Sequence, residues 1–498
     1  MTIFSIKKLT ESFSDCILAY GHFDSIHPGH IRYLKYAKEK GKCLVIALRG
    51  DLVVNGKNRF QFSQSERAES LDLLSIANHI ICLEGDELYK LVENLKPKML
   101  IFGKEFENTN DVNLIKAINV QKRINGEIFF HAGEINYASI DLLSGSENEL
   151  IQRRRSQFLV AIKRQNINKT NLLSSLEKWK SSRLLVIGDT ILDQYAACET
   201  LGVSAEAPVL VVRELAKKNY IGGASIVASH ITALGAKCDF ISVVGEDEAA
   251  KSVKENINLM NVETNLIVDP SRPTTFKKRY VVENQKLFRV SNLEDHTLNS
   301  DIEEKVISLI KEKSKSVQGI VVSDFLYGFV TPKIMETVYK MSSKYGLKLF
   351  GDLQCSTQVG SIKKYKKFSL LCPNEKEARI ALQDKDSGLE ILSNNLITQT
   401  MSERLIMKLG ADGFIAYDRD QNGNLKSQSF PALSVNPVDV SGAGDSLLAC
   451  MGCGLTSNQN MMTTSALGCF VTSLAVENMG NIPVTSNEVI SKIESFLV

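Results

Sequence analysis

The sequence predicts an α/β protein built from two doubly wound domains, and three observations support this prediction. Two short apolar runs, at 16–21 and 184–189, each end in a turn that contains glycine, as buried parallel strands often do. Behind each run, strand patterns alternate with helix patterns, which is typical of βαβ units around a parallel sheet. At roughly 100–200 residues per domain, a chain of 498 residues has room for two such domains.

The first predicted domain covers residues 1–142. Its expected strands are 16–21, 43–48, 79–83 and 99–103, and its expected helices are 31–38 and 65–74. In the first helix, Ile31, Leu34 and Ala37 recur at the spacing that puts them on one face. Because such sheets bind ligands beyond the carboxyl ends of their strands, we expect the site of this domain at that edge.

Residues 143–180 form a polar connector that we expect to be mostly helical. The segment has helical spacing and contains neither glycine nor proline after Gly145. Its basic residues, at 153–155 and 163–164, are not interleaved with aromatic ones. We therefore interpret this basic cluster as a solvated face, with a nucleic-acid or membrane patch as the alternative.

The second predicted domain covers residues 181–498. Its expected strands are 184–189, 240–244, 319–323, 348–352, 370–372 and 404–408. Two further segments, 209–220 and 274–290, are expected to form β ribbons beside the main sheet.

Composition excludes several classes of protein. The 59 lysines and arginines nearly balance the 57 aspartates and glutamates, and the formal net charge of +2 argues against a polyanion-coating protein. No apolar run approaches the ~20 residues that a membrane span needs, and residues 1–13 lack the apolar core of a signal peptide. Ten cysteines without a regular framework indicate reduced thiols. We expect a soluble cytoplasmic protein that binds neither nucleic acid nor membranes.

A histidine motif joins the first strand to the first helix. Residues 21–30 contain His27 and His30 with a glycine between them. Backbone N–H groups and the helix dipole favour an anion at such a turn, and imidazole N–H groups can donate to phosphoryl oxygens. For the motif alone, two other interpretations stay open: a turn without function, and a metal site, which would lack a third ligand of suitable spacing.

The residues around these histidines resemble the cytidylyltransferase-like nucleotidyltransferases. Gly21, Phe23 and Asp24 match the family's GxFDxxHxGH pattern. The resemblance implies that a phosphate monoester attacks the α-phosphorus of ATP or CTP and releases pyrophosphate, with no covalent enzyme intermediate. It implies that His27, His30 and Arg67 act with Mg²⁺ in catalysis. The implied nucleotide-binding residues are Gly21, Phe23, Asp24, Arg59, Arg67 and Gly103.

A second motif, DVSGAGDS at 439–446, precedes a helix of small and apolar residues. Its glycines free backbone N–H groups that can wrap an anion at the helix N-terminus, so we expect an anion hole formed by Gly442, Ala443 and Gly444. Asp445 can accept a proton from a substrate hydroxyl while these amides stabilise a transferring phosphoryl group. The GxxxxGK[ST] spacing of a Walker A loop is absent.

The DxxGAGD motif resembles the signature of the ribokinase-like, pfkB-type sugar kinases. This resemblance implies that Asp445 is the catalytic base, that ATP is the phosphoryl donor, and that the kinase forms a homodimer through its β ribbons. It implies Mg²⁺ near Asn374 and Glu377. The implied nucleotide-binding residues are Asn374, Glu377, Lys408, Gly410 and Gly413, and the implied sugar-binding residues are Asp189, Asp193, Gly222 and Gly223. Cys450 and Cys453, on the helix after the motif, are expected to be buried thiols rather than zinc ligands.

The two resemblances together are similar to the bifunctional heptose 7-phosphate kinase and heptose 1-phosphate adenylyltransferase family, with the domain order reversed. Lys277 and Arg279 match that family locally, which implies positive charge for a phosphorylated sugar. The implied substrates are sugar phosphates and nucleoside triphosphates. The implied product is a nucleotide-activated sugar, ADP-heptose-like, for lipopolysaccharide.

The chain departs from that family at several sugar-contact positions. Gly202 and Ile226 replace an arginine and an asparagine, Tyr327 replaces a lysine, and Gln354–Cys355 replaces a Lys-Gly pair. A hydrogen bond from a charged side chain to a sugar phosphate contributes ~1.5–3 kcal/mol, so these replacements weaken recognition of that phosphate. Two alternatives therefore stay open: a kinase for another sugar or polyol fused to a transferase that makes a CDP-linked product, and a partly degenerate protein in which one domain only binds.

Overall fold

The structure is a computed structural model. It describes residues 2–5, 15–24, 26, 28–51, 53–54, 57–58, 60, 62–85, 87–103, 106, 109, 111–131, 147–283, 285–354, 360–385, 387–419, 423 and 425–497. The chain forms two compact units: unit 1 comprises Met1–Gly145 and Leu382–Asn395, and unit 2 comprises Ser146–Ala381 and Leu396–Val498.

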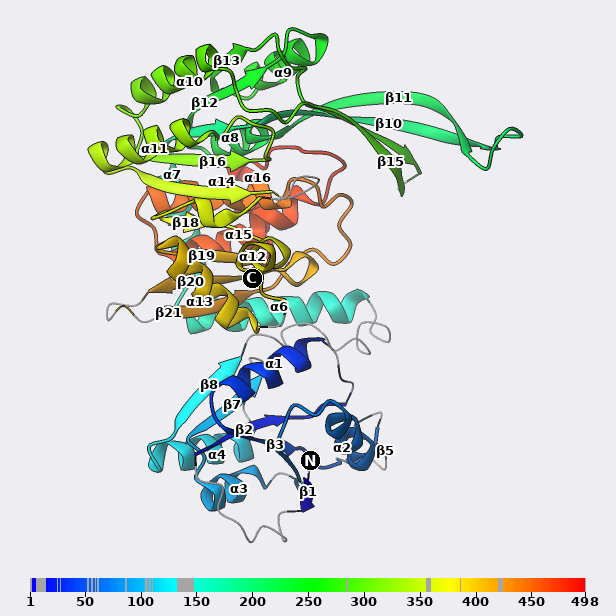
Figure 1. Cartoon of the computed structure of the whole chain (residues 1–498), viewed down its shortest axis with the longest axis vertical. Coiled ribbons are helices and arrows are strands. Elements are labelled where there is room, and N and C mark those ends of the chain that lie inside the picture. Colours follow the sequence, from blue (N-terminus) through cyan, green and yellow to red (C-terminus); the bar gives the residue numbers. More distant parts are fainter. Residues whose placement is uncertain are drawn as a thin grey trace. The chain divides into compact units, whose positions relative to one another are not determined.

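Unit 1 contains a parallel sheet in the order β1-β6-β3-β2-β7-β8 (Figure 1). The strands are β1 (Thr2–Ser5), β2 (Cys16–Gly21), β3 (Cys43–Leu48), β6 (His79–Cys82), β7 (Met99–Gly103) and β8 (Glu127–His131). A small antiparallel pair, β4 (Val53–Val54) and β5 (Lys57–Asn58), stands apart. The helices of the N-terminal segment are α1 (Pro28–Glu39), α2 (Gln64–Leu73), α3 (Leu88–Leu95) and α4 (Val112–Arg123).

This sheet is covered on both faces, as the sequence predicts for a doubly wound fold. Alternate residues of β2 enter different cores: Ile17 and Ala19 pack with α1 and α2, whereas Leu18 and Tyr20 pack with α3 and α4. The four predicted strands and both predicted helices of this domain are present. β1, β8, α3 and α4 were not predicted.

Unit 2 is organised around a sheet of order β13-β12-β9-β16-β17-β18-β19-β20-β21, parallel up to β19 and antiparallel thereafter. Its strands are β9 (Arg183–Gly188), β12 (Lys237–Val244), β13 (Glu263–Val268), β16 (Gly319–Asp324), β17 (Lys348–Leu353), β18 (Leu370–Leu371), β19 (Leu405–Lys408), β20 (Phe414–Arg419) and β21 (Leu425–Phe430). All six strands predicted for this sheet are found.

A second sheet of unit 2, β11-β10-β14-β15, contains the predicted ribbons. It is formed by β10 (Thr190–Val203), β11 (Leu210–Gly223), β14 (Phe276–Val282) and β15 (Gln285–Asn292). β10 and β11 leave the body of the unit as a long paired arm (Figure 1). The sequence indicated β11 but not β10, which follows β9 after a single residue.

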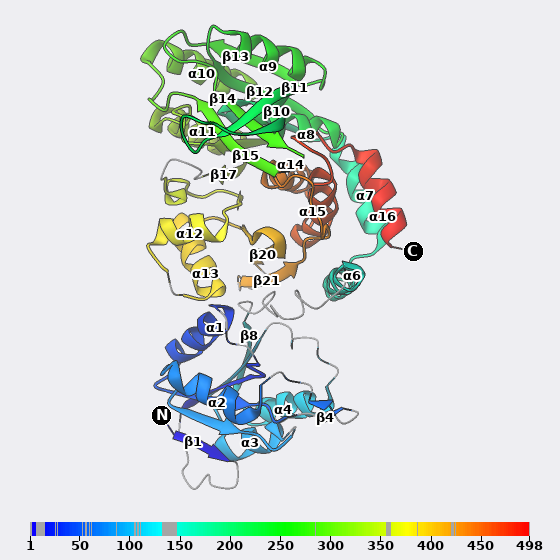
Figure 2. The ribbon, with the colours of Figure 1, turned by 90° about the vertical axis from the view of Figure 1, so that its right-hand side faces the viewer.

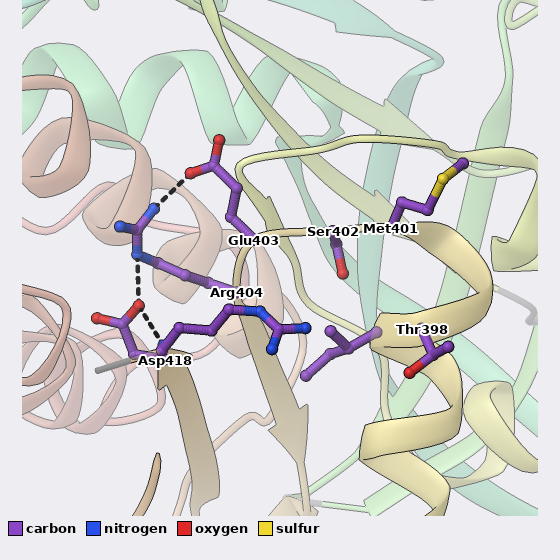
Figure 3. Close-up of a pocket in the computed structure, with 8 residues that line it drawn as sticks. Thr398, Met401, Ser402, Glu403, Arg404 and Asp418 are labelled. Atoms are coloured by element: carbon purple, nitrogen blue, oxygen red, sulfur yellow. Dashed lines mark hydrogen bonds and ion pairs between the residues drawn. The ribbon is translucent and has the colours of Figure 1, made fainter. Parts of the chain in front are cut away.

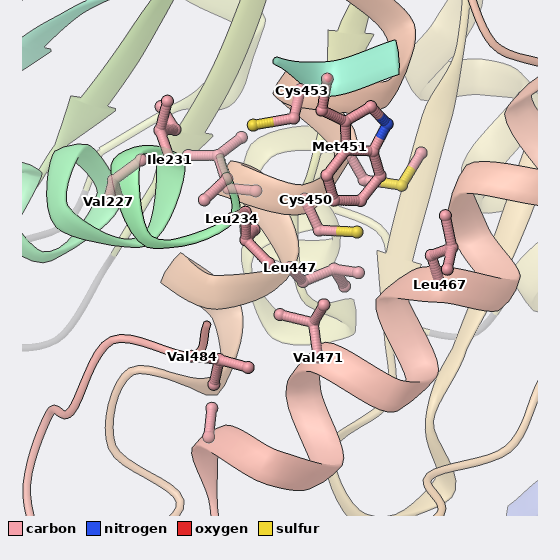
Figure 4. Close-up of a cluster of buried hydrophobic side chains, with 14 of the residues drawn as sticks. Val227, Ile231, Leu234, Leu447, Cys450, Met451, Cys453, Leu467, Val471 and Val484 are labelled. Atoms are coloured by element: carbon pink, nitrogen blue, oxygen red, sulfur yellow. The ribbon is translucent and has the colours of Figure 1, made fainter. Parts of the chain in front are cut away.

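Helices cover the main sheet of unit 2. Those from the middle of the chain are α8 (Ala224–Ala233), α9 (Glu248–Asn258), α10 (Ser300–Lys313), α11 (Pro332–Tyr345) and α12 (Glu375–Leu382). The C-terminal helices are α14 (Ala443–Thr456), α15 (Met461–Ala475) and α16 (Ser486–Phe496). α13 (Leu389–Thr400) begins in the segment that belongs to unit 1 and ends in unit 2. Side chains of α8, α14 and α15 interdigitate in one core, which Figure 4 shows around Val227, Cys450 and Val471.

The predicted thiols lie in this core. Cys450 and Cys453 have no exposed surface, and burial raises the pKa of both. The prediction that they are buried thiols is therefore confirmed. No described helix is both long enough and apolar enough to cross a membrane.

The helical segment before β9 belongs to unit 2. It forms α6 (Glu147–Arg164) and α7 (Lys169–Trp179), which Figure 2 shows beside α16. The apolar sides of both helices enter the main core, and Trp179 is fully buried. The expectation of a solvated basic face is wrong for two residues. Arg154 donates to the Ser434 carbonyl, and Arg155 donates to the Phe496 carbonyl at 2.8 Å, because one side of α6 packs against the C-terminal region.

Candidate active sites

The DVSGAGDS motif lies at the N-terminus of α14, as predicted. Gly442 is the N-cap residue, with a left-handed φ of +78°. A β-carbon there would lie 2.5 Å from the side-chain oxygen of Asn481, so conformation and space both require glycine. The first turn of α14 therefore presents backbone N–H groups without side-chain obstruction at Gly442 and Gly444, which suits an anion.

Asp445 lies in that first turn and is only 5% exposed. The side-chain amide of Gln354 donates to its Oδ1 at 3.1 Å. Burial, reinforced by the negative charge of Asp352, raises the pKa of Asp445 to about 7, while Lys408 and Lys277 oppose the shift. A carboxylate with this pKa is matched to general-base work near neutral pH.

A buried ion pair lies beside this carboxylate. The Nζ of Lys408, at the end of β19, is 2.6 Å from Oδ2 of Asp352, at the end of β17. Burial alone would lower the pKa of Lys408, but Asp352 and Glu377 raise it, so the lysine is a fixed cation. Lys408 was predicted; Asp352 was missed, although its place at a strand end could have indicated it.

Several predicted sugar-binding residues lie at the same edge. Asp193 accepts hydrogen bonds from Arg279 and, at 3.2 Å, from Asn481. A β-carbon on Gly222 would lie 2.5 Å from the carboxylate of Asp193, which explains that glycine. Asp193 and Lys277 both act electrostatically on Asp445, so the structure brings the predicted sugar site and the predicted base together.

Lys277 and Asp189 take different positions around the turn after β16. The ammonium of Lys277 lies over the rings of Phe325 and Tyr327, 5.4 and 5.2 Å from their centroids. Asp189 instead accepts the backbone N–H of Phe325 at 2.9 Å, and its pKa is raised to about 7 by burial and by Asp324. Gly223, also predicted here, is the N-cap of α8 with φ +65°.

The β ribbons hold the anion-hole loop in place. Asp439 accepts from Lys286 of β15 and from the Tyr195 hydroxyl of β10, both at 2.6 Å, and from the Ser441 N–H at 2.9 Å. Burial acts to raise the pKa of Asp439, but these hydrogen bonds lower it to about 2. Neither Lys286 nor Tyr195 was singled out from the sequence.

A cavity of about 440 Å³ opens beside the anion hole. One end has Lys408, Ala443 and Gly444, and the remainder is largely apolar. The predicted nucleotide-binding glycines, Gly410 and Gly413, line it too. The other lining residues are Arg154, Ala411, Phe414, Pro431, Ala432, Leu433, Ser434, Val435, Pro437, Val440, Leu447, Thr472, Ser473 and Val476. A cationic end and an apolar remainder suit a nucleotide.

Asn374 and Glu377, predicted near Mg²⁺, cap α12. Each accepts the backbone N–H of the other residue at 2.8 Å, which is a reciprocal capping arrangement. Neither lines the cavity, and the described residues hold no cluster of three or more metal-binding side chains. Protein sites for Mg²⁺ commonly use one or two carboxylates plus substrate phosphates, and Glu377 lies near Lys408, so these residues fit a metal that arrives with a nucleotide.

A further cavity of about 590 Å³ near the end of α13 has charged walls (Figure 3). Arg404 pairs there with Glu403 at 2.8 Å and with Asp418 at 3.0 Å. The charge of Arg404 is therefore balanced by two carboxylates, and no site residue predicted from the sequence lines this cavity.

The described start of the histidine motif, at the end of β2, lies where the sheet of unit 1 changes winding direction. β2 is flanked by β3 on one side and β7 on the other, so Gly21 and Gly103 end neighbouring strands at one edge. The Tyr33 hydroxyl of α1 lies 2.9 Å from the Tyr20 carbonyl oxygen and 2.8 Å from that of Ile101, where it can donate to either. Tyr33, which was missed, thus holds the two strand ends.

Phe23 and its neighbours shape the turn after β2. Phe23 is buried with φ +50°, and its ring lies 5.0 Å from that of the half-buried His30. Asp24 accepts the Phe62 N–H at 3.1 Å. His27 and Arg59 lie outside the described residues.

Arg67 differs from the prediction. It is 1% exposed, and its guanidinium donates to the carbonyls of His22, Phe62 and Arg49 and to the Asp51 carboxylate at 2.8 Å. These contacts make it a brace for the loops around the site rather than an open triphosphate ligand. The capping box of Ser63 and Glu66 begins α2 and so sets where Arg67 lies.

Two family models match the chain. The pfkB family carbohydrate kinase model matches residues 181–487, and the cytidylyltransferase-like model matches residues 18–192. Among curated proteins, the chain is 29% identical over 326 residues to bifunctional protein HldE of Trichlorobacter lovleyi and 30% over 310 residues to that of Campylobacter jejuni. The similarity to HldE of Helicobacter hepaticus is 31% over 324 residues. In each case the chain matches 64% of the relative's length, and 62–64% of this chain is aligned.

Solved structures share the fold of unit 2. Phosphofructokinase-2 of Escherichia coli in complex with potassium superposes with a TM-score of 0.53 at 18% identity, covering 64% of this chain and 99% of that one. Its tetrameric inhibited form gives a TM-score of 0.51 with the same identity and coverage. These likenesses confirm the predicted kinase fold.

Proposed function

Because the chain belongs to the pfkB family of carbohydrate kinases, we propose that unit 2 phosphorylates a sugar phosphate with ATP and that unit 1 transfers a nucleotidyl group to the sugar 1-phosphate so formed. The sugar is heptose 7-phosphate-like and is phosphorylated at C1. The nucleotide donor of the second step is ATP, which yields an ADP-heptose-like product and pyrophosphate. The curated relatives with two activities support this pairing.

One observation carries the kinase proposal: Asp445, with a pKa of about 7, lies in the first turn of α14 beside Lys408 and the cavity. In the reaction, the sugar hydroxyl gives its proton to Asp445 as its oxygen bonds to the γ-phosphorus and the bond to ADP breaks. The amides of residues 442–444 and Lys408 stabilise the charge on the transferring group. Lys277 and Arg279 offer positive charge to the phosphate that the sugar already bears.

Magnesium fits this site through Asn374 and Glu377 together with the phosphates of ATP. When bound, the ion would neutralise charge on the phosphates. The chain's own residues hold the nucleotide at Gly410 and Gly413 and move the proton at Asp445.

The transferase proposal rests on the strand ends of unit 1. A phosphate oxygen of the sugar 1-phosphate attacks the α-phosphorus of the nucleotide, and the bond to pyrophosphate breaks. His27 and His30 donate to the phosphoryl oxygens, and Gly21, Phe23, Asp24 and Gly103 shape the nucleotide's place. Arg59 binds phosphate directly, whereas Arg67 supports the loops.

A different sugar is the second candidate, and one contact favours it. Gln354 stands where the heptose family has a lysine, and its amide is directed to the base. The charge that a lysine would bring to the sugar phosphate is therefore missing at this position. A transferase that uses CTP and makes a CDP-linked product is the corresponding alternative for unit 1.

We further propose a homodimer through the ribbons and a cytoplasmic location. Apolar side chains are exposed along the arm at Leu201, Val203, Val209, Leu210, Val211 and Leu215, which suits burial against a second copy. Leu215→Asp should then shift the protein from dimer to monomer in sedimentation velocity. The nine cysteines of the described residues are free thiols, which supports a reducing compartment.

Phosphorus NMR tests the function directly. The purified full chain is mixed with Mg²⁺, ATP and D-glycero-D-manno-heptose 7-phosphate, and we expect a new anomeric phosphate signal with an equal amount of ADP. With heptose 1-phosphate and ATP we expect pyrophosphate. Binding of ATP without turnover would favour another sugar, whereas no binding of ATP by unit 2 would overturn the kinase proposal.

A further inference from the structure

Helix α6 lies outside the part of the chain that the kinase family model matches, which begins at residue 181. It is nevertheless fixed to unit 2. The Phe158 ring packs 5.1 Å from that of Phe470 and 5.6 Å from that of Phe496, centroid to centroid. Near the end of α6, Gln165 donates to Gln428 of β21 at 3.0 Å, and the two elements lie side by side in Figure 1. The position of α6 is therefore set by the kinase core.

One residue of α6, Arg154, lines the cavity beside the anion hole. Its side chain is half-buried and donates to the carbonyl of Ser434, which lines the same cavity. Asp412, from the turn between Gly410 and Gly413, interacts with Arg154 electrostatically: burial raises the pKa of that carboxyl to about 6, and the charge of Arg154 opposes the shift. Arg154 thus connects two segments that both line the cavity.

The guanidinium has capacity beyond these contacts. It carries five N–H donors in a planar fork, and its hydrogen bond to the Ser434 carbonyl occupies one of them. A cation that is half-buried at a cavity wall loses hydration, and a ligand that accepts hydrogen bonds or offers a flat ring can replace that hydration.

The segments that line the cavity suit different parts of a nucleotide, and Arg154 contacts the apolar one. Lys408 and Gly444 mark the phosphate end, next to Asp445. Ser434 belongs instead to the segment with Pro431, Leu433 and Pro437, whose apolar character suits a nucleoside. Arg154 is tied to that segment and not to the anion hole.

We propose that Arg154 binds the nucleoside part of ATP in the kinase site, so that the nucleotide site is completed by a helix from outside the kinase family match. This inference rests on the proposed function of unit 2. The planar guanidinium offers stacking to the purine base and N–H donors to the base or ribose. Arg154 is a binding residue and takes no part in proton transfer.

The test uses hydrogen–deuterium exchange of the full chain with ADP and Mg²⁺ as the probe. Peptides covering 408–414 and 431–447 report the kinase cavity alone, so nucleotide bound to unit 1 does not enter the readout. In Arg154→Ala we expect the ADP concentration for half-maximal protection to rise about tenfold, since alanine cannot make the charge-assisted hydrogen bonds to the nucleotide. Arg154→Lys, which keeps the charge but not the fork, should show a smaller rise. Arg153→Ala, the matched control with an exposed neighbouring arginine, should bind as the wild type does.

The outcomes separate this inference from the proposed function. Absence of ADP protection in the wild-type chain would overturn the proposed kinase. Wild-type protection together with unchanged binding in Arg154→Ala would overturn only the role of Arg154. Faster exchange of 431–437 in Arg154→Ala without ADP, with unchanged affinity in Arg154→Lys, would assign Arg154 to the fold and equally overturn its role as a nucleotide ligand.

Discussion

The two candidate sites occupy the same position in their folds but differ in the side chains that lie at that position. Each lies at the carboxyl edge of a parallel sheet, next to a glycine-containing turn and the start of a helix. In unit 2 the turn leads to a buried carboxylate, Asp445, with two lysines and a second carboxylate nearby. In unit 1 the described residues are mainly a packed frame, in which Tyr33 and Arg67 hold backbone segments. The proposed kinase must move a proton and has a buried carboxylate for that step, whereas the proposed nucleotidyl transfer requires positioning and charge.

Replacing the proposed catalytic base, Asp445, should change the rate of ADP formation more than any other substitution, and it tests this comparison most strongly. Asp445→Asn should lower ADP formation by ~10³-fold or more, because general-base catalysis is lost. Pyrophosphate formation from sugar 1-phosphate should be unchanged. His30→Ala should do the reverse. Coupled assays for ADP and for pyrophosphate measure both in one preparation. If Asp445→Asn retains ADP formation, the assignment of the base is wrong.

Arg67 should matter to stability more than to chemistry. Arg67→Ala leaves several buried acceptors without a donor and should destabilise unit 1 by ~3 kcal/mol. Hydrogen–deuterium exchange of unit 1 peptides at increasing urea concentration would measure this destabilisation. ADP formation by unit 2 serves as the control. If Arg67→Ala has wild-type stability but binds the nucleotide poorly, Arg67 contacts the phosphates directly, as the sequence predicted.

The pH dependence of the two activities should differ. Asp445 must be ionised to accept a proton, so a pKa of about 7 means that kcat/KM for ADP formation falls about tenfold per pH unit below 7 and levels off above it. Asp352→Asn removes a negative charge that raises this pKa, so the acid limb should move to lower pH. Initial rates between pH 5 and 9 measure the profile, and an unmoved limb would show that Asp352 does not set it.

Gln354 should have the smallest effect. Its N–H stabilises the ionised form of Asp445, so Gln354→Ala should raise the pKa of the base and move the acid limb to higher pH by less than about one unit. Gln354→Glu, a matched change of nearly equal size, adds a negative charge and should move the limb further in the same direction. Identical pH profiles for the wild type, Gln354→Ala and Gln354→Glu would show that Gln354 does not influence the pKa of Asp445.

The sequence predicted the fold class and most of the sheet strands because buried parallel strands are continuous apolar runs. It missed β10, whose residues from Ala197 onward mix polar and apolar types along a largely exposed arm, so no period is visible. It also missed β1 and β8 at the edges of the sheet in unit 1, where a short run carries little signal.

Motif residues and their partners were not equally predictable. Asp445 and Gly442 are in a local pattern that the sequence shows directly. Gln354 meets Asp445 from 91 residues away, and only the fold brings them together. Arg67 was identified by its motif, but its burial depends on four acceptors from other segments. Local sequence therefore indicates what chemistry is present more reliably than which side chains remain open to a ligand.

The packing of α6 and α7 limits where recombination could divide the gene of such a chain without destabilising the kinase unit. Phe158, Leu172, Leu176 and Trp179 are part of the kinase core although they precede the family match. A protein that starts at residue 181 would lack these side chains, and the apolar surfaces of α14, α15 and α16 that they cover would be exposed to water. The loss of folding free energy would be ~1.5–3 kcal/mol for each large side chain removed. Recombination that exchanges the first unit for another would therefore preserve a stable kinase only when its breakpoint falls before α6.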